Sequence, residues 1–199
     1  MKVYKKTKLV CGVGVNDADY PVSRSVDYGF GLSYSKCKFY ITWVNMLKRC
    51  YSASYQLNKP TYVGCESCDE WLFFSNFKAW MEKQDWHGKY LDKDILLLGN
   101  KTYSPQTCLF VSPLVSSFLK SESDFSEERA DGVYYDKKNK VFKSDCCNPI
   151  TGKREFVGRY NSEAIAHIAW KKRKHELACQ IADIQTDIRV ANALRTRYA

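Results

Sequence analysis

Four of the nine cysteines in this 199-residue chain are spaced in a way that could bind a metal ion. Cys65 and Cys68 form a C-x₂-C pair, the spacing that lets two thiolates hold one Zn²⁺ ion tetrahedrally. Cys50 and Cys108 fall on an expected helix and an expected strand, and could complete a four-cysteine site. The odd number of cysteines and the lack of a visible export signal argue against a disulfide scaffold. The alternative to zinc is that these thiols are free and packed in a hydrophobic core.

Two carboxylates stand close together near the middle of the chain. Asp92 and Asp94 follow a short apolar run and are separated by one residue. Hard cations prefer carboxylate oxygens, so this pair is the main candidate for binding Mg²⁺. The alternative is an exposed pair of charges at the end of a strand.

The C-terminal third of the chain is strongly basic. The whole chain has 31 Lys and Arg against 22 Asp and Glu, a formal net charge of +9. Residues 131–199 hold 14 of these basic and 8 of these acidic residues, and so two thirds of the net charge. Such a domain favours nucleic acid as a partner, because Lys and Arg release counterions from phosphates. The alternative is a solvated basic surface, and both interpretations also apply to the run Lys171–Lys174.

The elements that must position these residues are predicted first in the N-terminal half. Apolar residues at helical spacing predict a helix over 39–50 and a second one over 69–83. Their expected buried residues are Phe39, Trp43, Met46, Leu47 and Cys50 in the first helix, and Phe73, Phe74, Phe77, Trp80 and Met81 in the second. Residues 89–120 then predict a strand, a loop, a second strand and a helix.

The C-terminal region predicts three β-strands followed by helix. The strands are expected at 132–135, 140–143 and 155–160, joined by turns into an antiparallel sheet. Ser162 can cap a helix that continues without Gly or Pro to residue 197, as one helix or as two in succession. A heptad seam in this helix predicts either a homodimer or packing back onto the protein. The seam consists of Leu177, Ile181, Ile184, Ile188 and Ala191.

An ordered series of residues lies between positions 37 and 120. It comprises Trp43, Met46, Arg49-Cys50-Tyr51, Cys68-Asp69-Glu70-Trp71, Phe74, Phe77, Leu91-Asp92, Gly99-Asn100, Tyr103-Ser104-Pro105 and Cys108. The series resembles the phage-type HNH homing-endonuclease family. This resemblance implies a ββα-metal finger that cuts DNA with a divalent metal ion.

The resemblance assigns the chemistry to positions in the strand–loop–strand segment. The expected catalytic residues are Asp92, Lys93, Asp94, Asn100 and Thr107. In the family a histidine at the end of the first strand activates water, and Lys93 stands at that place. Thr107 stands where an asparagine supports that histidine, and Ser116 or Ser117 stands at the metal-ligand position of the following helix. Lysine is protonated at neutral pH and is a poor general base, so these replacements also predict loss of cleavage.

A second set of residues covers positions 131–178. It comprises Gly132-Val133, Val141-Phe142-Lys143, Gly152-Lys153, Val157-Gly158-Arg159-Tyr160, Glu163-Ala164, Ala166 and Ala169. The set resembles the Apetala-two/ethylene-response-factor DNA-binding domain, which also accompanies phage homing nucleases. The resemblance implies a sheet that lies in the major groove of DNA, with a helix packed behind it.

Basic residues of this region are the candidates for contacting DNA. The candidates are Lys137, Lys138, Lys140, Lys143, Lys153, Arg154, Arg159, Lys171 and Lys172. Arg154 and Arg159 are expected at base edges, because a guanidinium can bind O6 and N7 of guanine together. The lysines are expected at phosphates.

These observations predict an α+β protein with an HNH-like domain over 1–120, a linker over 121–130 and an Apetala-two-like domain over 131–199. The N-terminal part is expected to be helical with a ββα-metal-like finger, and the C-terminal part to be a three-stranded antiparallel sheet packed on a helix. The apolar runs are too short for a membrane-spanning helix, so the cytoplasm, of a host cell if the chain is phage-encoded, is the expected location.

The expected function is binding of double-stranded DNA, with cutting or nicking of it by a divalent metal ion. One alternative is a DNA-binding regulator that descends from a nuclease and has lost cleavage. Another is a phage structural or interaction protein, and RNA could take the place of DNA.

Overall fold

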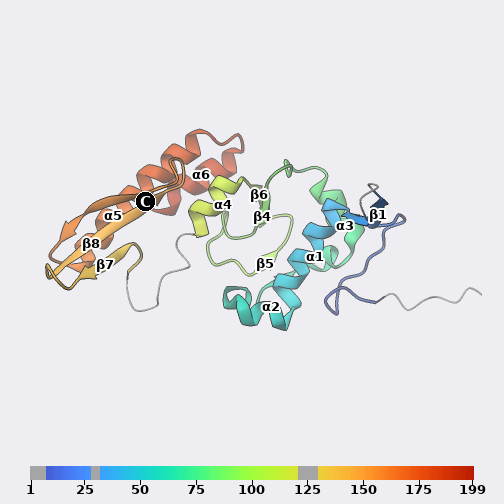
Figure 1. The fold of residues 1–199 in the computed structure, drawn as a ribbon. Helices are drawn as coiled ribbons and strands as arrows, with labels where there is room; N and C mark the ends of the chain where they lie inside the picture. Colours follow the sequence, from blue (N-terminus) through green and yellow to red (C-terminus); the bar gives the residue numbers. More distant parts are fainter. Residues whose placement is uncertain (1–7, 28–31, 121–129) are drawn as a thin grey trace, which may run out of the picture. The chain divides into compact units, whose positions relative to one another are not determined.

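The computed structural model describes residues 8–27, 32–120 and 130–199 (Figure 1). Within these ranges the protein is mixed α+β, with six α-helices and a three-stranded antiparallel sheet that is followed by C-terminal helix, as the sequence predicts. None of the helices in these ranges has the length and apolar character needed to cross a membrane.

The described residues form two compact units. The first unit is built from residues up to His87 and from Leu91–Phe110, and the second from Gly88–Tyr90 and Val111–Ala199. Residues 121–129 of the expected linker lie outside the described ranges. The expected domain boundaries therefore remain a prediction, although by its contacts the helix that begins at Pro113 belongs to the second unit.

Helices dominate the first unit, and its strands are short. Its helical elements are α1 (Lys38–Tyr51), α2 (Ala53–Asn58), the 3₁₀ helices η1 (Pro60–Tyr62) and η2 (Asp69–Leu72), and α3 (Phe74–Met81). Its strands are β1 (Ser23–Asp27), β2 (Leu32–Lys36), β3 (Glu66–Ser67), β5 (Thr102–Tyr103) and most of β4 (Tyr90–Asp92) and β6 (Leu109–Val111), each of which has one residue assigned to the second unit. β1 pairs with β2, β3 pairs in parallel with β5, and β4 pairs with β6.

The core of the first unit is aromatic, as the helical spacing predicts. Trp43 and Phe74 are fully buried, and the Trp43 Nε1–H donates a hydrogen bond to the Trp71 carbonyl at 2.7 Å. Phe73 differs from the prediction, since 45% of its surface is exposed. Its backbone is extended (φ −96°, ψ 127°) and divides the expected helix 69–83 into η2 and α3, which takes its side chain off the buried face.

In the second unit, a sheet packs on helices. Its elements are α4 (Pro113–Lys120), β7 (Val133–Asp136), β8 (Val141–Asn148), β9 (Lys153–Tyr160), α5 (Glu163–Asp183) and α6 (Ile188–Arg197). The strand order is β7-β8-β9, and α5 packs along one face of this sheet (Figure 1). Gly132 permits the close approach of α5, because a Cβ at this position would lie 2.0 Å from the Trp170 ring.

The C-terminal helical segment turns back on itself. α5 ends at Asp183, and the side chain of Asp187 caps α6 by accepting a hydrogen bond from the Arg189 amide at 2.9 Å. Of the heptad seam, Leu177 and Ala191 are buried within the unit. Ile181 is buried as well, whereas Ile184 and Ile188 are 62% and 66% exposed, so only part of the seam packs back onto the protein, and the homodimer stays a prediction.

A buried lysine joins α4 to α5. Only 1% of Lys174 is exposed. Its Nζ lies 4.1 Å from the centroid of the Phe118 ring and donates to the Phe118 carbonyl at 3.3 Å. The Trp170 and Tyr198 rings lie at 5.6 and 5.7 Å, so aromatic faces surround the ammonium group.

Candidate nucleic-acid interface

The sheet of the second unit has one covered face and one open face. Side chains alternate between faces along a strand. Ser144, Cys146 and Asn148 of β8 are buried and lie on the face that α5 covers. Lys143, Asp145 and Cys147 alternate with these residues along β8 and therefore point to the opposite side of the sheet, which we call the outer face.

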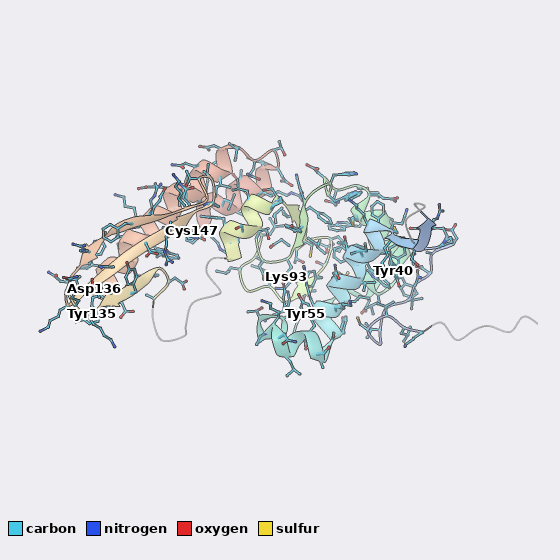
Figure 2. All side chains as sticks on the ribbon, in the orientation of Figure 1. Tyr40, Tyr55, Lys93, Tyr135, Asp136 and Cys147 are labelled. Carbon is cyan, nitrogen blue, oxygen red and sulfur yellow. The ribbon has the colours of Figure 1, made fainter. Side chains whose placement is uncertain are left out.

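Strand register identifies the members of the outer face, because residues directly opposite each other share a face. The opposed pairs on it are Tyr134–Lys143, Asp136–Val141, Lys143–Arg159, Asp145–Phe156 and Cys147–Arg154. Figure 2 shows Asp136 toward one end of the sheet and Cys147 toward the other. Three of the predicted DNA-contacting residues, Lys143, Arg154 and Arg159, therefore share one surface.

Two of these three cations are paired with carboxylates. Lys143 Nζ lies 2.5 Å from Asp136 Oδ2, and Arg154 Nε donates to Asp145 Oδ1. The hydrogen bond from Lys143 is the main reason that the pKa of Asp136 is well below its usual range. Both carboxylates hold their partners in place and also reduce the positive charge of the outer face.

Arg159 differs from its two neighbours. Its guanidinium carbon lies 5.9 Å from the centroid of the Phe156 ring. Among the described residues no carboxylate forms an ion pair with Arg159, and its side chain is exposed. It is therefore the cation of the outer face whose donors are most available to a ligand.

The turn between β7 and β8 presents three exposed lysines beside the outer face. Lys137, Lys138 and Lys140 are all exposed. Asp136 organises this turn, because its Oδ1 accepts hydrogen bonds from the amides of Lys138 at 3.0 Å and Asn139 at 3.2 Å. The turn therefore holds a cluster of positive charge in a defined backbone conformation at the end of the sheet.

The remaining basic candidates do not belong to the outer face. Lys153 is exposed at the start of β9, where the alternation assigns it to the other face. Lys171 and Lys172 are exposed on α5, the helix that covers the other face of the sheet. The structure therefore separates these three lysines from Lys143, Arg154 and Arg159.

The expected catalytic residues are also brought together, in the first unit. Asp92 Oδ1 accepts hydrogen bonds from the amides of Asp94 and Ile95, both at 2.8 Å. Asn100 donates from Nδ2 to the carbonyls of Lys93 at 2.9 Å and of Thr102 at 2.7 Å. Their hydrogen bonds fix the loop between β4 and β5.

Thr107 and Lys93 complete this network. Thr107 Oγ1 donates to the Thr102 carbonyl at 2.7 Å. Lys93, labelled in Figure 2, is 5% exposed, and its Nζ donates to Asp94 Oδ1 at 2.7 Å and to the Asn100 carbonyl. The ammonium group at the position expected for a general base is thus bonded to the loop itself.

Arg49 was part of the ordered series but had no assigned role. It is partly buried, and its Nη1 donates long hydrogen bonds to the Leu91 carbonyl at 3.4 Å and to the Tyr103 hydroxyl at 3.5 Å. Burial raises the pKa of Tyr103, and the nearby Arg49 charge opposes that rise. Arg49 therefore links α1 to β4 and β5 and helps to hold the loop.

The expected metal sites are wrong. Among the described residues, no group of three or more His, Cys, Asp or Glu side chains is arranged to hold a metal ion, so neither Zn²⁺ nor Mg²⁺ is supported. Cys50, Cys65 and Cys108 are free thiols buried in the hydrophobic core of the first unit, and Cys68 packs against that core. Burial raises the pKa of Cys50 and of Cys108 to about 12, which disfavours the thiolate that a metal requires.

The side chains of Asp92 and Asp94 bond to other groups of the protein, whereas they were expected to bind Mg²⁺. Asp92 caps the following turn, and Asp94 pairs with Lys93. The metal-ligand positions expected in the next helix, Ser116 and Ser117, lie on α4 of the second unit.

Sequence reasoning missed three outer-face residues, Asp136, Asp145 and Phe156. The hairpin between β7 and β8 could have pointed to Asp136 as the partner of Lys143, whereas the pairing of Asp145 with Arg154 depends on the register between β8 and β9. Phe156 was counted only as an apolar strand residue, although 60% of its surface is exposed.

No family model, curated protein or solved structure matches the chain.

Proposed function

We propose that this protein binds double-stranded DNA through the outer face of β7–β9 and the adjoining lysine turn. The observation that carries the proposal is the gathering of Lys143, Arg154 and Arg159 on the sheet face opposite the one that α5 covers. The resemblance of this region to the Apetala-two domain supports the same surface. That resemblance also supports the major groove as the docking place.

A small antiparallel sheet is one of the elements that can dock in a groove of DNA. The major groove of B-DNA is about 12 Å wide and admits a helix or a β-ribbon. Arginines on the strands are expected at base edges, whereas lysines of the turn are expected at the phosphate backbone. Arg154 and Arg159 lie near the two ends of the edge strand β9, and Lys137, Lys138 and Lys140 lie in the turn between β7 and β8.

The ion pairs on the outer face favour selective over indiscriminate binding. Asp136 and Asp145 neutralise part of the positive charge that would otherwise attract any phosphate backbone. Non-specific affinity depends on the number of neutralised phosphates and is therefore reduced. A base edge can still be read by a guanidinium that is held in place by a carboxylate.

We propose that the segment 92–107 serves as a scaffold in a protein related to the HNH nucleases. Lys93 is buried and donates its hydrogen bonds within the loop, and Asn100 and Thr107 satisfy backbone carbonyls. These contacts use the groups that the resemblance assigns to catalysis. Supercoiled DNA incubated with the protein is accordingly expected to stay intact, and nicked or linear product that disappears with Asp92→Ala would overturn this part of the proposal.

The test of DNA binding is the salt dependence of affinity. Fluorescence anisotropy with a labelled random-sequence duplex would be measured at increasing salt for the full chain and for Lys138→Ala and Lys140→Ala. Each lysine that contacts a phosphate is expected to change the slope of log K against log salt by about 0.9 when it is removed. Arg195→Ala, on α6, removes the same charge away from the sheet and is expected to keep the slope.

Two results would contradict the proposal. One is the absence of any duplex-dependent anisotropy change at low salt. The other is an equal effect of Arg195→Ala and the two turn variants, which would mean that only the total charge matters. A preference for single-stranded competitor over duplex would replace double-stranded DNA with a single-stranded partner.

A further inference from the structure

The outer face contains one irregularity in its strand pairing. A single step along β8, from Ser144 to Asp145, corresponds to a two-residue step along β9, from Gly158 to Phe156. Val157 is therefore the extra residue of a β-bulge. Bulges change the direction in which neighbouring side chains point.

The bulge brings together two side chains that a regular strand would separate. Residues three apart in a regular strand point to opposite faces. Phe156 and Arg159 are three apart, but the guanidinium carbon lies 5.9 Å from the ring centroid. An exposed aromatic ring and an exposed cation without an ion-pair partner among the described residues thus form one composite surface.

We propose that Phe156 and Arg159 together recognise a DNA step in which a 5-methylpyrimidine lies next to a guanine. The inference rests on the proposed function and adds to it the sequence feature that the outer face reads. In the major groove, arginine binds O6 and N7 of guanine, and an apolar side chain such as phenylalanine contacts the methyl group at C5 of thymine.

The separation of the two side chains fits neighbouring base pairs. Successive base pairs are stacked about 3.4 Å apart, so two steps cover about 7 Å. The 5.9 Å between the Arg159 guanidinium carbon and the Phe156 ring centroid lies between one step and two steps, so the outer atoms of the two side chains can reach adjacent base pairs. The stacked ring also limits the rotamers of Arg159, which reduces the entropy lost when the guanidinium binds a base.

Arg154 provides the contrast on the same strand. Its Nε donates to Asp145, and the residue opposite it on β8 is Cys147 rather than an aromatic residue. Among the described residues, its guanidinium is in an ion pair and makes no close contact with an aromatic ring, unlike that of Arg159. The composite reading of a methyl group and a guanine belongs to the Phe156–Arg159 pair.

The 5-methyl group has two sources in DNA, thymine and 5-methylcytosine, and the experiment distinguishes them. Random-sequence duplexes retained by the full-length protein would first be sequenced. The retained duplexes are expected to share a step of thymine beside guanine. The best duplex would then be rebuilt with thymine, uracil, 5-methylcytosine or cytosine at the pyrimidine, each with its matched complement.

Removing the methyl group and removing the guanine N7 should have separable effects. Uracil in place of thymine is expected to weaken binding roughly fourfold, the effect of exposing one buried methyl group. 7-Deazaguanine in place of guanine is expected to weaken it by about tenfold. Equal affinity for thymine and 5-methylcytosine duplexes would assign recognition to the methyl group alone, whereas preference for thymine would assign it to the whole T·A pair.

Single-residue variants test whether Phe156 contacts the methyl group and Arg159 contacts N7 of guanine. Phe156→Ala is expected to bind thymine and uracil duplexes equally and to keep its sensitivity to 7-deazaguanine. Arg159→Ala is expected to lose the sensitivity to 7-deazaguanine. The matched controls are Ile168→Ala and Arg195→Ala, which remove an exposed apolar side chain from α5 and a cation from α6 and should retain both sensitivities.

The outcomes separate this inference from the function on which it rests. Retained duplexes without the step, or a wild-type protein that is indifferent to the methyl group, would overturn the inference and leave DNA binding in place. Failure to retain any duplex would overturn the proposed function itself.

Discussion

The loop at 92–107 in the first unit and the outer face of β7–β9 in the second use similar residue types in opposite ways. In the loop, Lys93 and Asn100 are buried and bond to each other's backbone carbonyls. On the outer face, Lys143 and Arg159 lie on the surface of a sheet, and only one of them has a carboxylate partner among the described residues. Polar residues that satisfy one another stabilise a fold, whereas polar residues left facing solvent are available to a partner.

The largest expected difference between the two units concerns their thiols. The pKa of Cys50 and of Cys108 is raised to about 12 by burial, whereas Cys147 is exposed on the outer face. The thiolate is the reactive form, so iodoacetamide at neutral pH is expected to alkylate Cys147 roughly a thousandfold faster than either buried thiol. Peptide mass spectrometry over time would measure the rates.

The same experiment tests the interface. Addition of duplex DNA is expected to slow alkylation of Cys147 and to leave Cys179, on α5, unaffected. Comparable rates at Cys50 and Cys147 would contradict the buried thiols, and equal protection of Cys147 and Cys179 would contradict binding at the outer face.

A smaller effect is expected from breaking the loop network. Asn100→Ala removes the two hydrogen bonds that the Asn100 amide donates to buried carbonyls and the one that it accepts from the Thr102 amide. The unfolding free energy is expected to fall by ~3 kcal/mol, because three hydrogen bonds are lost and the Lys93 carbonyl loses this donor inside the protein, whereas the Thr102 carbonyl keeps its bond from Thr107 Oγ1. Urea titration followed by tryptophan fluorescence would measure this loss.

The variant also separates architecture from binding. Below the urea range in which Asn100→Ala unfolds, its affinity for duplex DNA is expected to equal that of the unaltered chain. A loss of affinity without loss of stability would place the loop in the binding site and erase the contrast between the two units.

The smallest effect is expected from the carboxylates of the outer face. Asp145→Asn removes a negative charge and releases Arg154 from its ion pair. Affinity for random-sequence duplex is expected to rise by about threefold at low salt and by less at high salt, since charge screening increases with salt. Asp183→Asn, which removes the partner of Arg195 at the end of α5, is the matched control.

The sequence was sufficient for the general fold of the second unit and for several residues of its outer face. Alternating apolar residues and turn residues predicted the three strands, and Arg154 and Arg159 were correctly placed on the sheet. The Arg154–Asp145 ion pair and the bulge at Val157 could not be predicted, because both depend on the register between β8 and β9, which no local pattern encodes.

In the first unit the sequence predicted the buried helical core better than the metal sites. The helical spacing of Trp43 and Phe74 indicated a core, and both are buried. The C-x₂-C pair predicted zinc, but cysteine is also a common core residue, and spacing alone does not distinguish the two. The state of Lys93 depends on Asn100 and on the loop between them, and those contacts exist only in the folded chain.

The most direct test of the central claim is a titration of the ¹⁵N-labelled full chain with duplex DNA, followed by amide chemical shifts. The amide shifts are expected to change along β7–β9 and in the turn at 137–140, whereas the amides of 92–107 are expected to keep their positions. Shifts concentrated at 92–107, or no shifts in the sheet at a DNA concentration that saturates binding, would contradict binding at the outer face.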